Sequence, residues 1–554
     1  MSTGLFETHR PRLDAAVSAS ASRTWYSAFD ESPSPRVYGE QAAAEGRAAY
    51  DAWLGGAFPL TTPGAEGTVA TERSPYGFDL DVAYPHVRNV SGLMAAAESG
   101  MRAWRVAGPD GRTGVCLEIL DRLHARVFEL ANAVQHTSGQ AFVMAFQAGG
   151  ANALDRALEA IAYAWVEMTR TPETAIWEKP ARGEPLRMEK TFTVMPRGVA
   201  LVIGCNTFPT WNSWPGLFAS LVTGNPVVVK PHPNAVLPLA ITVQVCQEVL
   251  AEQGFEPNLV MLAAEAPGDR LAAVLAVRPE VRVIDFTGGT AFGDWLEQRA
   301  HQAVVFTEKA GVNCIVVDST SDFAGMCQNI AFSLALYTGQ MCTSPQDIFV
   351  PASGVETDEG RKAPADVAAG IAAALDRLLG DDARAVEILG AVVTPDVRAR
   401  LEKAATVGEV LIPSRDIAHP AYPDATVRTP LLVGLDAVDA DTYAAECFGP
   451  VSYLIRTADI EEAIALFAIT VVRHGAMTAS VYSTSEDVIE QMRWAALESG
   501  VALSENLTGG VFVNQSAAFS DFHGTGANPA ANATYTDGAY VASRFRVIQS
   551  RRHI

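Results

Sequence analysis

The sequence predicts an α/β protein in which a doubly wound, Rossmann-type domain precedes a second α/β domain. Two observations favour this class. Short apolar runs alternate with segments of helical periodicity from about residue 199 to residue 286, and a similar alternation runs from about 313 to 470. Parallel strands that are buried on both faces appear as continuous apolar runs, and helices connect them. Ligand sites are therefore expected at the carboxyl ends of the strands.

Apolar runs locate the strands of both domains. In the first domain they cover residues 199–203, 226–229, 259–262 and 281–286, with helical segments at 216–222 and 237–252. In the second domain they cover residues 314–317, 347–350 and 451–455. Residues 91–168 precede the first strand, and their apolar positions recur every three or four residues, which indicates helices.

The chain of 554 residues is too long for one compact core, so several domains are expected. Residues 1–90 contain scattered Pro and Gly and are interpreted as an N-terminal arm with a few short helices. Residues 91–311 form the first α/β domain, with a protruding hairpin at 170–195, and residues 312–515 form the second. Residues 516–554 are a return segment that ends in a strand, because positions 540–549 alternate with a period of two.

The composition argues against several classes of function. A net charge of −22 makes nucleic-acid binding unfavourable, since phosphate would be repelled. The longest apolar stretch, residues 215–229, is interrupted by a Thr-Gly-Asn-Pro run, so no membrane span is expected. Seven cysteines without a CxxC pair predict neither a disulfide framework nor a metal site, and residues 1–12 lack an apolar leader, so we expect a cytoplasmic protein.

Two side chains could carry covalent chemistry. Cys342 ends the run Gly339-Gln-Met-Cys342 between a helical stretch and a strand, where a glycine lets the backbone approach a ligand. Glu308 follows a strand at 303–306, and a carboxylate at a strand end is well placed to act as a base. Each pattern alone occurs more often without function, because an isolated cysteine is usually buried and inert and an isolated loop glutamate is usually solvated.

Three further patterns could bind a phosphate or a ribose. A glycine turn follows the strand 281–286 and leads into a helix, whose first amides can face a phosphate. This turn is not a GxGxxG fingerprint, so alone it would equally fit an ordinary tight turn. A lysine ends the strand at 226–229, and an acid-aromatic pair precedes the strand at 451–455. The residues concerned are Lys230, Thr287, Gly288, Gly289, Glu446 and Phe448.

The order and spacing of these patterns resemble the aldehyde dehydrogenase superfamily. The matching elements stand here as Asn206-Thr-Phe-Pro209, Lys230, Phe286-Thr-Gly288, Glu308-Lys-Ala-Gly311, Gly339-Gln-Met-Cys342 and Glu446-Cys-Phe-Gly-Pro450. Glu308 and Cys342 lie 34 residues apart, which is typical of the family. The resemblance extends from about residue 91 to the C-terminus and implies an aldehyde dehydrogenase-like fold with a cofactor domain, a catalytic domain and a small oligomerisation sheet.

The resemblance also implies the chemistry, which is the NAD(P)-dependent oxidation of a small-molecule aldehyde to the carboxylic acid. Cys342 would be the nucleophile, Glu308 the base that activates water, and Asn206 the oxyanion donor. The cofactor would be NADP or NAD, bound by Gly204, Lys230, His232, Thr287, Gly288, Gly289, Glu446 and Phe448.

The sequence departs from the family pattern at the oxyanion element and at the phosphate-binding turn. Thr207 is inserted between Asn206 and Phe208, so Thr207 or Asn212 could replace Asn206 as the oxyanion donor. Gly289 stands where a phosphate-binding serine is common.

A third departure concerns the ribose. Pro233 stands three residues after Lys230, where members that prefer NAD often carry a glutamate. Without that carboxylate a 2′-phosphate is not repelled, and Lys230 and His232 could pair with it. NADP is therefore expected to bind at least as well as NAD.

Within the family, the stretches 205–214 and 521–529 are most similar to the monofunctional PaaN-type enzymes of phenylacetate degradation. That similarity implies a ring-opened, CoA-linked semialdehyde as the substrate. Three alternatives stay open: a CoA-acylating dehydrogenase, a semialdehyde dehydrogenase of another aromatic pathway, and an inactive binding protein on the same fold. Glu308 weighs against the first, because CoA-acylating members commonly lack this base.

The hairpin at 170–195 and the C-terminal strand would be marginal without further pairing. In the family such segments join subunits, so we expect a homodimer or homotetramer. The alternative is a terminal strand that pairs within its own chain.

Overall fold

Two sheets covered by helices form the centre of the computed structural model, which describes residues 2–309, 311–512 and 518–554. The first sheet ends at Glu308 and the second begins at Asn313, so the chain passes between them within a few residues. The two predicted α/β arrangements are confirmed. The predicted boundary between residues 515 and 516 lies outside the described residues, and the domain limits stay predictions.

The first sheet is doubly wound. Its five strands are parallel and lie in the order β7-β6-β5-β8-β9. The chain enters at β5, runs outward to β7 and then crosses to β8 and β9, so the order reverses between β5 and β8, where such sheets bind ligands. The strands are β5 (Val199–Ile203), β6 (Val227–Lys230), β7 (Val260–Leu262), β8 (Val281–Thr287) and β9 (Val304–Glu308).

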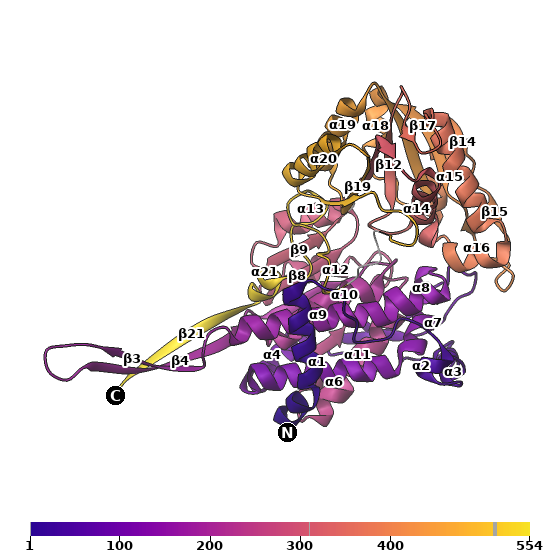
Figure 1. Ribbon diagram of the computed structural model, residues 1–554. Coiled ribbons are helices and arrows are strands. Elements are labelled where there is room, and N and C mark those ends of the chain that lie inside the picture. Colours follow the sequence, from indigo (N-terminus) through magenta and orange to yellow (C-terminus); the bar gives the residue numbers. More distant parts are fainter. Residues whose placement is uncertain (1, 310, 513–517) are drawn as a thin grey trace.

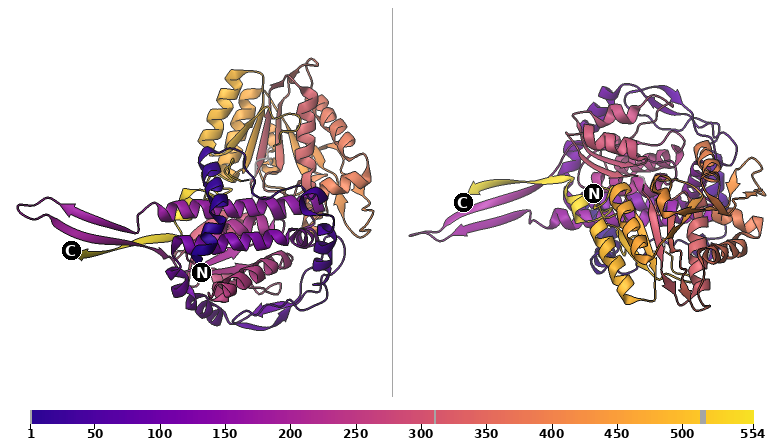
Figure 2. Two further views of the ribbon diagram at one scale, coloured as in Figure 1. Left: turned by 60° about the horizontal axis from the view of Figure 1, so that its bottom comes forward. Right: turned by 90° about the horizontal axis from the view of Figure 1, so that it is seen from above.

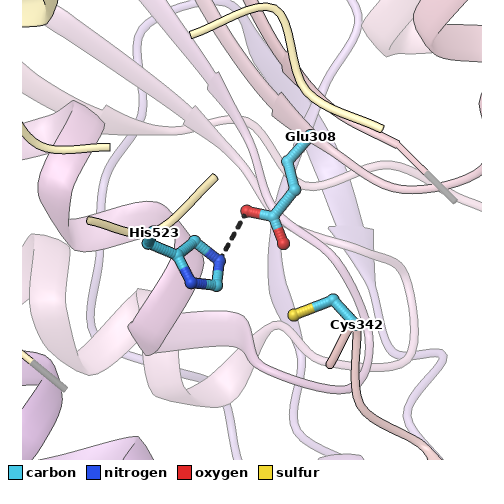
Figure 3. A group of neighbouring side chains, drawn as sticks. All are labelled: Glu308, Cys342 and His523. Carbon is cyan, nitrogen blue, oxygen red and sulfur yellow. Dashed lines mark hydrogen bonds and ion pairs between the residues drawn. The ribbon is translucent and has the colours of Figure 1, made fainter. Parts of the chain in front are cut away.

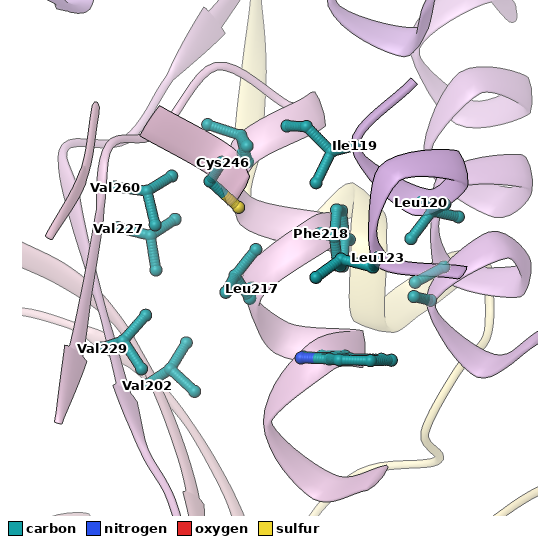
Figure 4. Close-up of a cluster of buried hydrophobic side chains, with 14 of the residues drawn as sticks. Ile119, Leu120, Leu123, Val202, Leu217, Phe218, Val227, Val229, Cys246 and Val260 are labelled. Atoms are coloured by element: carbon teal, nitrogen blue, oxygen red, sulfur yellow. The ribbon is translucent and has the colours of Figure 1, made fainter. Parts of the chain in front are cut away.

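The helices of this domain pack their apolar sides on the sheet. They are α10 (Pro209–Val222), α11 (Leu237–Glu252), α12 (Leu271–Ala276) and α13 (Thr290–Arg299). The first begins earlier than the predicted residue 216, because Pro209 fits the first turn of a helix, and the helix continues through Pro215 to Val222. Figure 4 shows Val202, Val227 and Val229 of the strands facing Leu217 of α10. Each fully buried valine or leucine contributes about 1.5–3 kcal/mol.

A layer of helices lies on the far side of α10. It consists of α5 (Met101–Val106), α6 (Gly108–Ala125), α7 (Val127–Ser138), α8 (Phe142–Phe146) and α9 (Asn152–Thr169), whereas α4 (Val90–Ser99) packs on the opposite face of the sheet. Together these helices confirm the predicted helical segment 91–168. Ile119, Leu120 and Leu123 of α6 meet Phe218 of α10 (Figure 4), so the layer and the sheet share one core.

The second sheet has seven strands in the order β14-β17-β18-β12-β10-β19-β20, and all neighbours are parallel except β14 and β17. The strands are β10 (Asn313–Val317), β12 (Pro345–Pro351), β14 (Glu409–Ile412), β17 (Leu431–Asp436), β18 (Val451–Thr457), β19 (Thr478–Tyr482) and β20 (Ala502–Glu505). Its main helices are α14 (Phe323–Ala335), α15 (Pro364–Leu379), α16 (Asp382–Leu389), α17 (Pro395–Ala404), α19 (Ile460–His474) and α20 (Glu486–Ser499). This domain lies above the first in Figure 1.

The N-terminal region differs from the prediction of a few short helices. Two short helices are present, α2 (Pro35–Tyr38) and α3 (Ala42–Asp51), followed by the hairpin of β1 (Ala65–Val69) and β2 (Tyr84–Val87). The prediction is wrong for α1 (Ser2–Ser22), a single helix of 21 residues. Phe6, Leu13 and Ala16 are buried in the core that α1 shares with α6 and α9, and this packing stabilises the long helix.

An arm of three antiparallel strands projects from the body (Figures 1 and 2). It has the order β21-β4-β3, with β3 (Thr174–Lys179) and β4 (Leu186–Pro196) forming the predicted hairpin and β21 (Phe545–His553) pairing with β4 of its own chain. The predicted start of the terminal strand at residue 540 is wrong. Residues Gly538–Ala542 form helix α21, which Asp537 caps by accepting a hydrogen bond from Tyr540 N.

A buried ion pair attaches the base of the arm to the first sheet. Arg544 is fully buried and donates to both carboxylate oxygens of Asp285 in β8, at 2.6 and 2.8 Å. Burial alone would lower the pKa of Arg544, but Asp285 and Tyr540 hold it above its ordinary value. The side chain therefore stays charged and links the C-terminal segment to the sheet that carries the site. None of the helices in the described ranges combines the length and apolar character needed to cross a bilayer.

Candidate active site

Cys342 lies on a tight loop between α14 and β12. Tyr337, Thr338 and Gly339 have φ angles of 52°, 55° and 62°, so the backbone turns through three left-handed residues just before the thiol. A Cβ on Gly339 would lie 2.5 Å from the carbonyl oxygen of Gly449, which excludes any larger residue there. The loop that carries Glu446 and Phe448 therefore lies directly beside the loop that carries the thiol.

Buried amide side chains hold this loop in place. Gln340 donates to the carbonyl oxygen of Ala391 at 3.1 Å and accepts from Val393 N at 2.8 Å. Asn313, at the start of β10, donates to the carbonyl oxygens of Cys342 and Ser344 at 2.8 and 2.9 Å. The backbone around Cys342 is thus anchored to β10 and to residues 391–393, which is the preorganisation that a covalent nucleophile would need.

Glu308 is the last residue of β9, and its side chain is buried. One carboxylate oxygen, Oε2, lies 3.1 Å from Nε2 of His523. The Cys342 sulfur, a Glu308 oxygen and a His523 ring nitrogen all lie within 4.8 Å of one another. Figure 3 shows the second oxygen of Glu308 on the side that faces the sulfur. The structure therefore brings the predicted nucleophile and base together and adds an imidazole.

Burial and neighbouring charges set the protonation states of Cys342 and Glu308. Burial and the Glu308 carboxylate raise the pKa of the Cys342 thiol well above its ordinary value. For Glu308, burial opposes ionisation, but His523 outweighs it with help from Arg156, and the pKa is lowered. The resting site therefore holds a protonated thiol against an ionised carboxylate.

Three residues were predicted as alternatives for the oxyanion donor. Asn206 donates one amide hydrogen to the carbonyl oxygen of Thr137 at 2.9 Å, which leaves the second hydrogen for a ligand. Asn212 directs its amide toward the sulfur of Cys205 at 3.6 Å. The backbone of Thr207 is held by Gln140, which donates to its carbonyl oxygen at 2.8 Å. Asn206 stays the predicted donor.

The predicted cofactor residues of the first domain gather at one edge of its sheet. Gly204 follows β5, Lys230 ends β6, Thr287 ends β8, and Gly288 and Gly289 lead into α13. Because these strands are parallel neighbours, all these residues lie at their carboxyl ends. No side chain caps the first turn of α13, and space beside Gly289 is open, so its amides can meet a phosphate. These donors fit a dinucleotide.

The ribose end of this edge holds a carboxylate that sequence reasoning missed. Lys230 is ion-paired with Glu265, which follows the neighbouring strand β7, and both side chains are buried. Burial and the charge of Lys230 lower the pKa of His232 to about 4, and its Nδ1 accepts a hydrogen bond from Asn234 N at 3.2 Å. His232 is therefore neutral near pH 7 and is no cationic partner for a phosphate.

Glu446 and Phe448 come from the catalytic domain. Gln346 accepts from Cys447 N at 2.6 Å and donates to the carbonyl oxygen of Ala445 at 3.1 Å, while Arg400 donates to the carbonyl oxygen of Phe448 at 2.9 Å. The Glu446 side chain is exposed, yet surrounding protein raises its pKa to about 7. These contacts hold the loop in place, and the Glu446 carboxylate lies close to the backbone N–H of Gly311.

His523, Glu265, Arg156 and Asn313 were not predicted as functional residues. Only His523 had a signal, since it lies in the stretch 521–529 that carries the family resemblance. The other three act through contacts with segments distant in sequence, which no local pattern reveals.

Two groups of described residues have the donor types and spacing of a metal site. One is Glu308, Cys342 and His523, and the other is His9, Glu118 and Asp121. In the first group the thiol is protonated and Glu308 already pairs with His523, so we do not assign a metal to it. In the second group Arg122 and Arg12 already pair with the two carboxylates.

The fold and the site define a dehydrogenase class, in which a dinucleotide-binding sheet edge lies beside a buried thiol and carboxylate. The aldehyde dehydrogenase family model matches residues 80–520. A solved structure of an NAD-dependent aldehyde dehydrogenase from Burkholderia multivorans is 55% identical, with a TM-score of 0.97 over 99% of both chains. Vanillin dehydrogenase from Pseudomonas fluorescens is 25% identical over 408 residues, which are 71% of this chain and 78% of that protein.

A more distant solved structure shows the same fold. The 1-pyrroline-5-carboxylate dehydrogenase from Thermus with bound NAD is 19% identical and has a TM-score of 0.72, over 96% of this chain and 99% of that one. The chain therefore belongs to the aldehyde dehydrogenase family, and the predicted NAD- or NADP-dependent enzyme class is confirmed.

Proposed function

We propose that this enzyme oxidises an aldehyde through a thioester on Cys342 and hydrolyses that thioester with Glu308. The observation that supports this most strongly is the buried group of Cys342, Glu308 and His523. The thiol sulfur, a carboxylate oxygen and a ring nitrogen of this group lie within 4.8 Å of one another. The carboxylate next to the thiol supplies the base that a hydrolytic member needs and a CoA-acylating member commonly lacks.

The reaction begins when the Cys342 thiol gives up its proton to water and its sulfur bonds to the aldehyde carbon. The resulting oxyanion accepts hydrogen bonds from the free amide hydrogen of Asn206 and from the Cys342 backbone N–H. A bound NAD(P)⁺ supplies the two-electron oxidation that turns this adduct into a thioester. Glu308 then accepts a proton from a water molecule, the water oxygen bonds to the carbonyl carbon, and the carbon–sulfur bond breaks.

The contacts at the ribose edge favour NAD over NADP. A carboxylate beside the lysine can accept a hydrogen bond from a ribose 2′-hydroxyl, as acids do in Rossmann folds, whereas it repels a 2′-phosphate. Glu265 occupies that place through its ion pair with Lys230, and Leu271 N donates to its other oxygen at 2.6 Å. The expectation that NADP binds at least as well as NAD rested on Pro233, Lys230 and His232, and the Glu265 carboxylate argues against it.

For the substrate we propose an aldehyde of aromatic catabolism, with the ring-opened, CoA-linked semialdehyde of phenylacetate degradation as the first candidate. The support is the similarity of stretches 205–214 and 521–529 to the PaaN-type enzymes. Trp211 and Phe208 contribute apolar surface near the site. Comparing kcat/KM for free and CoA-linked semialdehydes tests this, and equal values would remove the CoA group from the proposal.

We also propose that the arm joins subunits in a homodimer or homotetramer. The arm exposes apolar side chains that the body does not cover: Ile176, Leu186, Val547 and Ile548 are 41–57% exposed. Such surface on a thin projecting sheet is better stabilised against a second copy than in water.

Replacing Cys342 by Ala tests the catalytic proposal. We expect aldehyde-dependent cofactor reduction to fall to background, because the thiol that forms the thioester is removed, while NADH still binds in a fluorescence titration. Cys327→Ala is the matched control, since Cys327 lies in the second core away from the site. Activity of the Cys342 variant equal to that of the control would contradict the proposal.

A further inference from the structure

His523 reaches the site from a segment that is remote in sequence and firmly held. Its backbone N–H donates to the carbonyl oxygen of Tyr535 at 3.1 Å, and its carbonyl oxygen accepts from Tyr535 N at 2.9 Å. A few residues on, Ala530 accepts from Lys309 N at 2.6 Å. The segment is therefore pinned both to itself and to the residue that follows Glu308.

The contact between the His523 and Glu308 side chains has a defined donor and acceptor. An ionised carboxylate only accepts hydrogen bonds, so Nε2 of His523 must carry the hydrogen and donate to Oε2 of Glu308 at 3.1 Å. The other oxygen, Oε1, is buried and has no hydrogen-bond partner among the described residues. It is the oxygen on the Cys342 side in Figure 3. One oxygen is thus tied down, and the other is left for the reacting groups.

We propose that His523 is a positioning residue for the hydrolytic step, which holds Glu308 ionised with Oε1 directed at the carbon bonded to Cys342. This inference rests on the proposed function. In the step, the water oxygen bonds to the thioester carbon, one water proton passes to Oε1, and the thiolate leaves. His523 makes no bond to the substrate and acts only through Glu308.

The groups around Glu308 show why His523 is needed. Arg156 on α9 favours the carboxylate, while Cys205, Cys342 and Tyr535 have pKa values raised by burial and stay neutral near pH 7. Arg156 also interacts with Glu159 and lies over the Trp211 ring, so its charge is shared. Without His523, burial would dominate and part of the base would be protonated at rest.

The test compares His523→Ala and His523→Gln with wild type in rapid-mixing and pH experiments. We expect both variants to keep a burst of about one reduced cofactor per subunit, because thioester formation does not need the pinned base. Steady turnover of His523→Ala should fall by roughly tenfold to a hundredfold. Since removing the imidazole raises the pKa of Glu308, the acid limb of the pH profile should move up by about one unit.

The Gln variant separates positioning from charge. The Gln amide can donate to Oε2 of Glu308 but carries no charge. This variant should therefore recover part of the steady turnover rate, while the acid limb of its pH profile should stay shifted. The exposed His301, changed to Gln, is the matched control and should behave as wild type. If the wild type is active and neither variant moves the acid limb, the inference is overturned. If Cys342→Ala keeps wild-type activity, the proposed function fails instead.

Discussion

At the scale of single residues, the buried charges fall into two kinds. One carboxylate oxygen of Glu308 is buried beside a thiol without a hydrogen-bond partner in the described part of the chain. Burying an unpaired polar atom costs free energy, so this arrangement is useful only if a reacting group supplies the missing hydrogen bond. Arg544 and Asp285 satisfy each other with two short hydrogen bonds and have no such vacancy. The first arrangement is suited to chemistry, and the second holds the C-terminal segment in place.

The ion pair of Arg544 and Asp285 leads to a prediction about stability. Arg544→Met leaves a buried carboxylate without its partner, so we expect the free energy of unfolding to fall by about 3–5 kcal/mol. Arg361→Met removes one partner of an exposed pair with Glu356 and should cost about 0–1 kcal/mol. Urea unfolding followed by circular dichroism measures both, and equal losses would show that the buried pair has no special role.

At the scale of elements, the carboxyl edge of the first sheet combines residues from four strands. Lys230 ends β6 and Glu265 follows β7, so the pair exists only because these strands are neighbours. The backbone interaction between Ala263 N and Val229 O, at 2.7 Å, continues the pairing to the point where the two side chains meet.

Glu265→Gln tests the contribution of this edge to cofactor choice. Removing the charge that repels a 2′-phosphate should lower the preference for NAD over NADP by about tenfold or more. Fluorescence titration with NADH and NADPH gives the two dissociation constants without turnover. Glu280→Gln is the control, because Glu280 precedes β8 at the opposite edge. Wild-type enzyme that binds NADPH as tightly as NADH would contradict the assignment.

The sequence predicted these elements well where a local signal exists. The strands β5 to β8 follow continuous apolar runs, Glu308 stands in a short motif at the end of β9, and Cys342 stands in one before β12. The long helix α1 was missed because its buried positions pack on α6 and α9, a contact with no local signature. Glu265 and His523 were missed for the same reason, since each meets its partner across a sheet edge or a domain boundary.

At the scale of the whole molecule, the arm is the part least supported by its own chain. Its strands project from the body in both views of Figure 2, and the edge strand β3 and the terminal strand β21 expose apolar side chains. The base of the arm is rigid, because Arg544 fixes it to β8. A rigid base with an uncovered tip is the arrangement we expect of an element that contacts another subunit.

Truncation after Arg546 tests the arm while keeping the Arg544 anchor. We expect full-length protein to be a dimer or tetramer by light scattering and the shortened chain to lose assembly, because β4 loses its partner strand. Circular dichroism serves as the control for an intact body. Full-length protein that is monomeric at micromolar concentration would end the proposal, and a shortened chain that stays assembled would remove β21 from it.

The proposed reaction depends on two separate roles: Cys342 forms the thioester and Glu308 activates the water that hydrolyses it. Glu308→Gln tests this separation most directly. The neutral amide of the Glu308→Gln variant does not repel the Cys342 thiolate, so the thioester should still form. The base that takes a proton from water is removed, so the thioester should not be hydrolysed. Rapid mixing with aldehyde and NAD should give a burst of one reduced cofactor per subunit followed by a stall, and intact-mass measurement should find the acyl group on Cys342. Steady turnover at the wild-type rate, with no acyl-enzyme, would contradict the account.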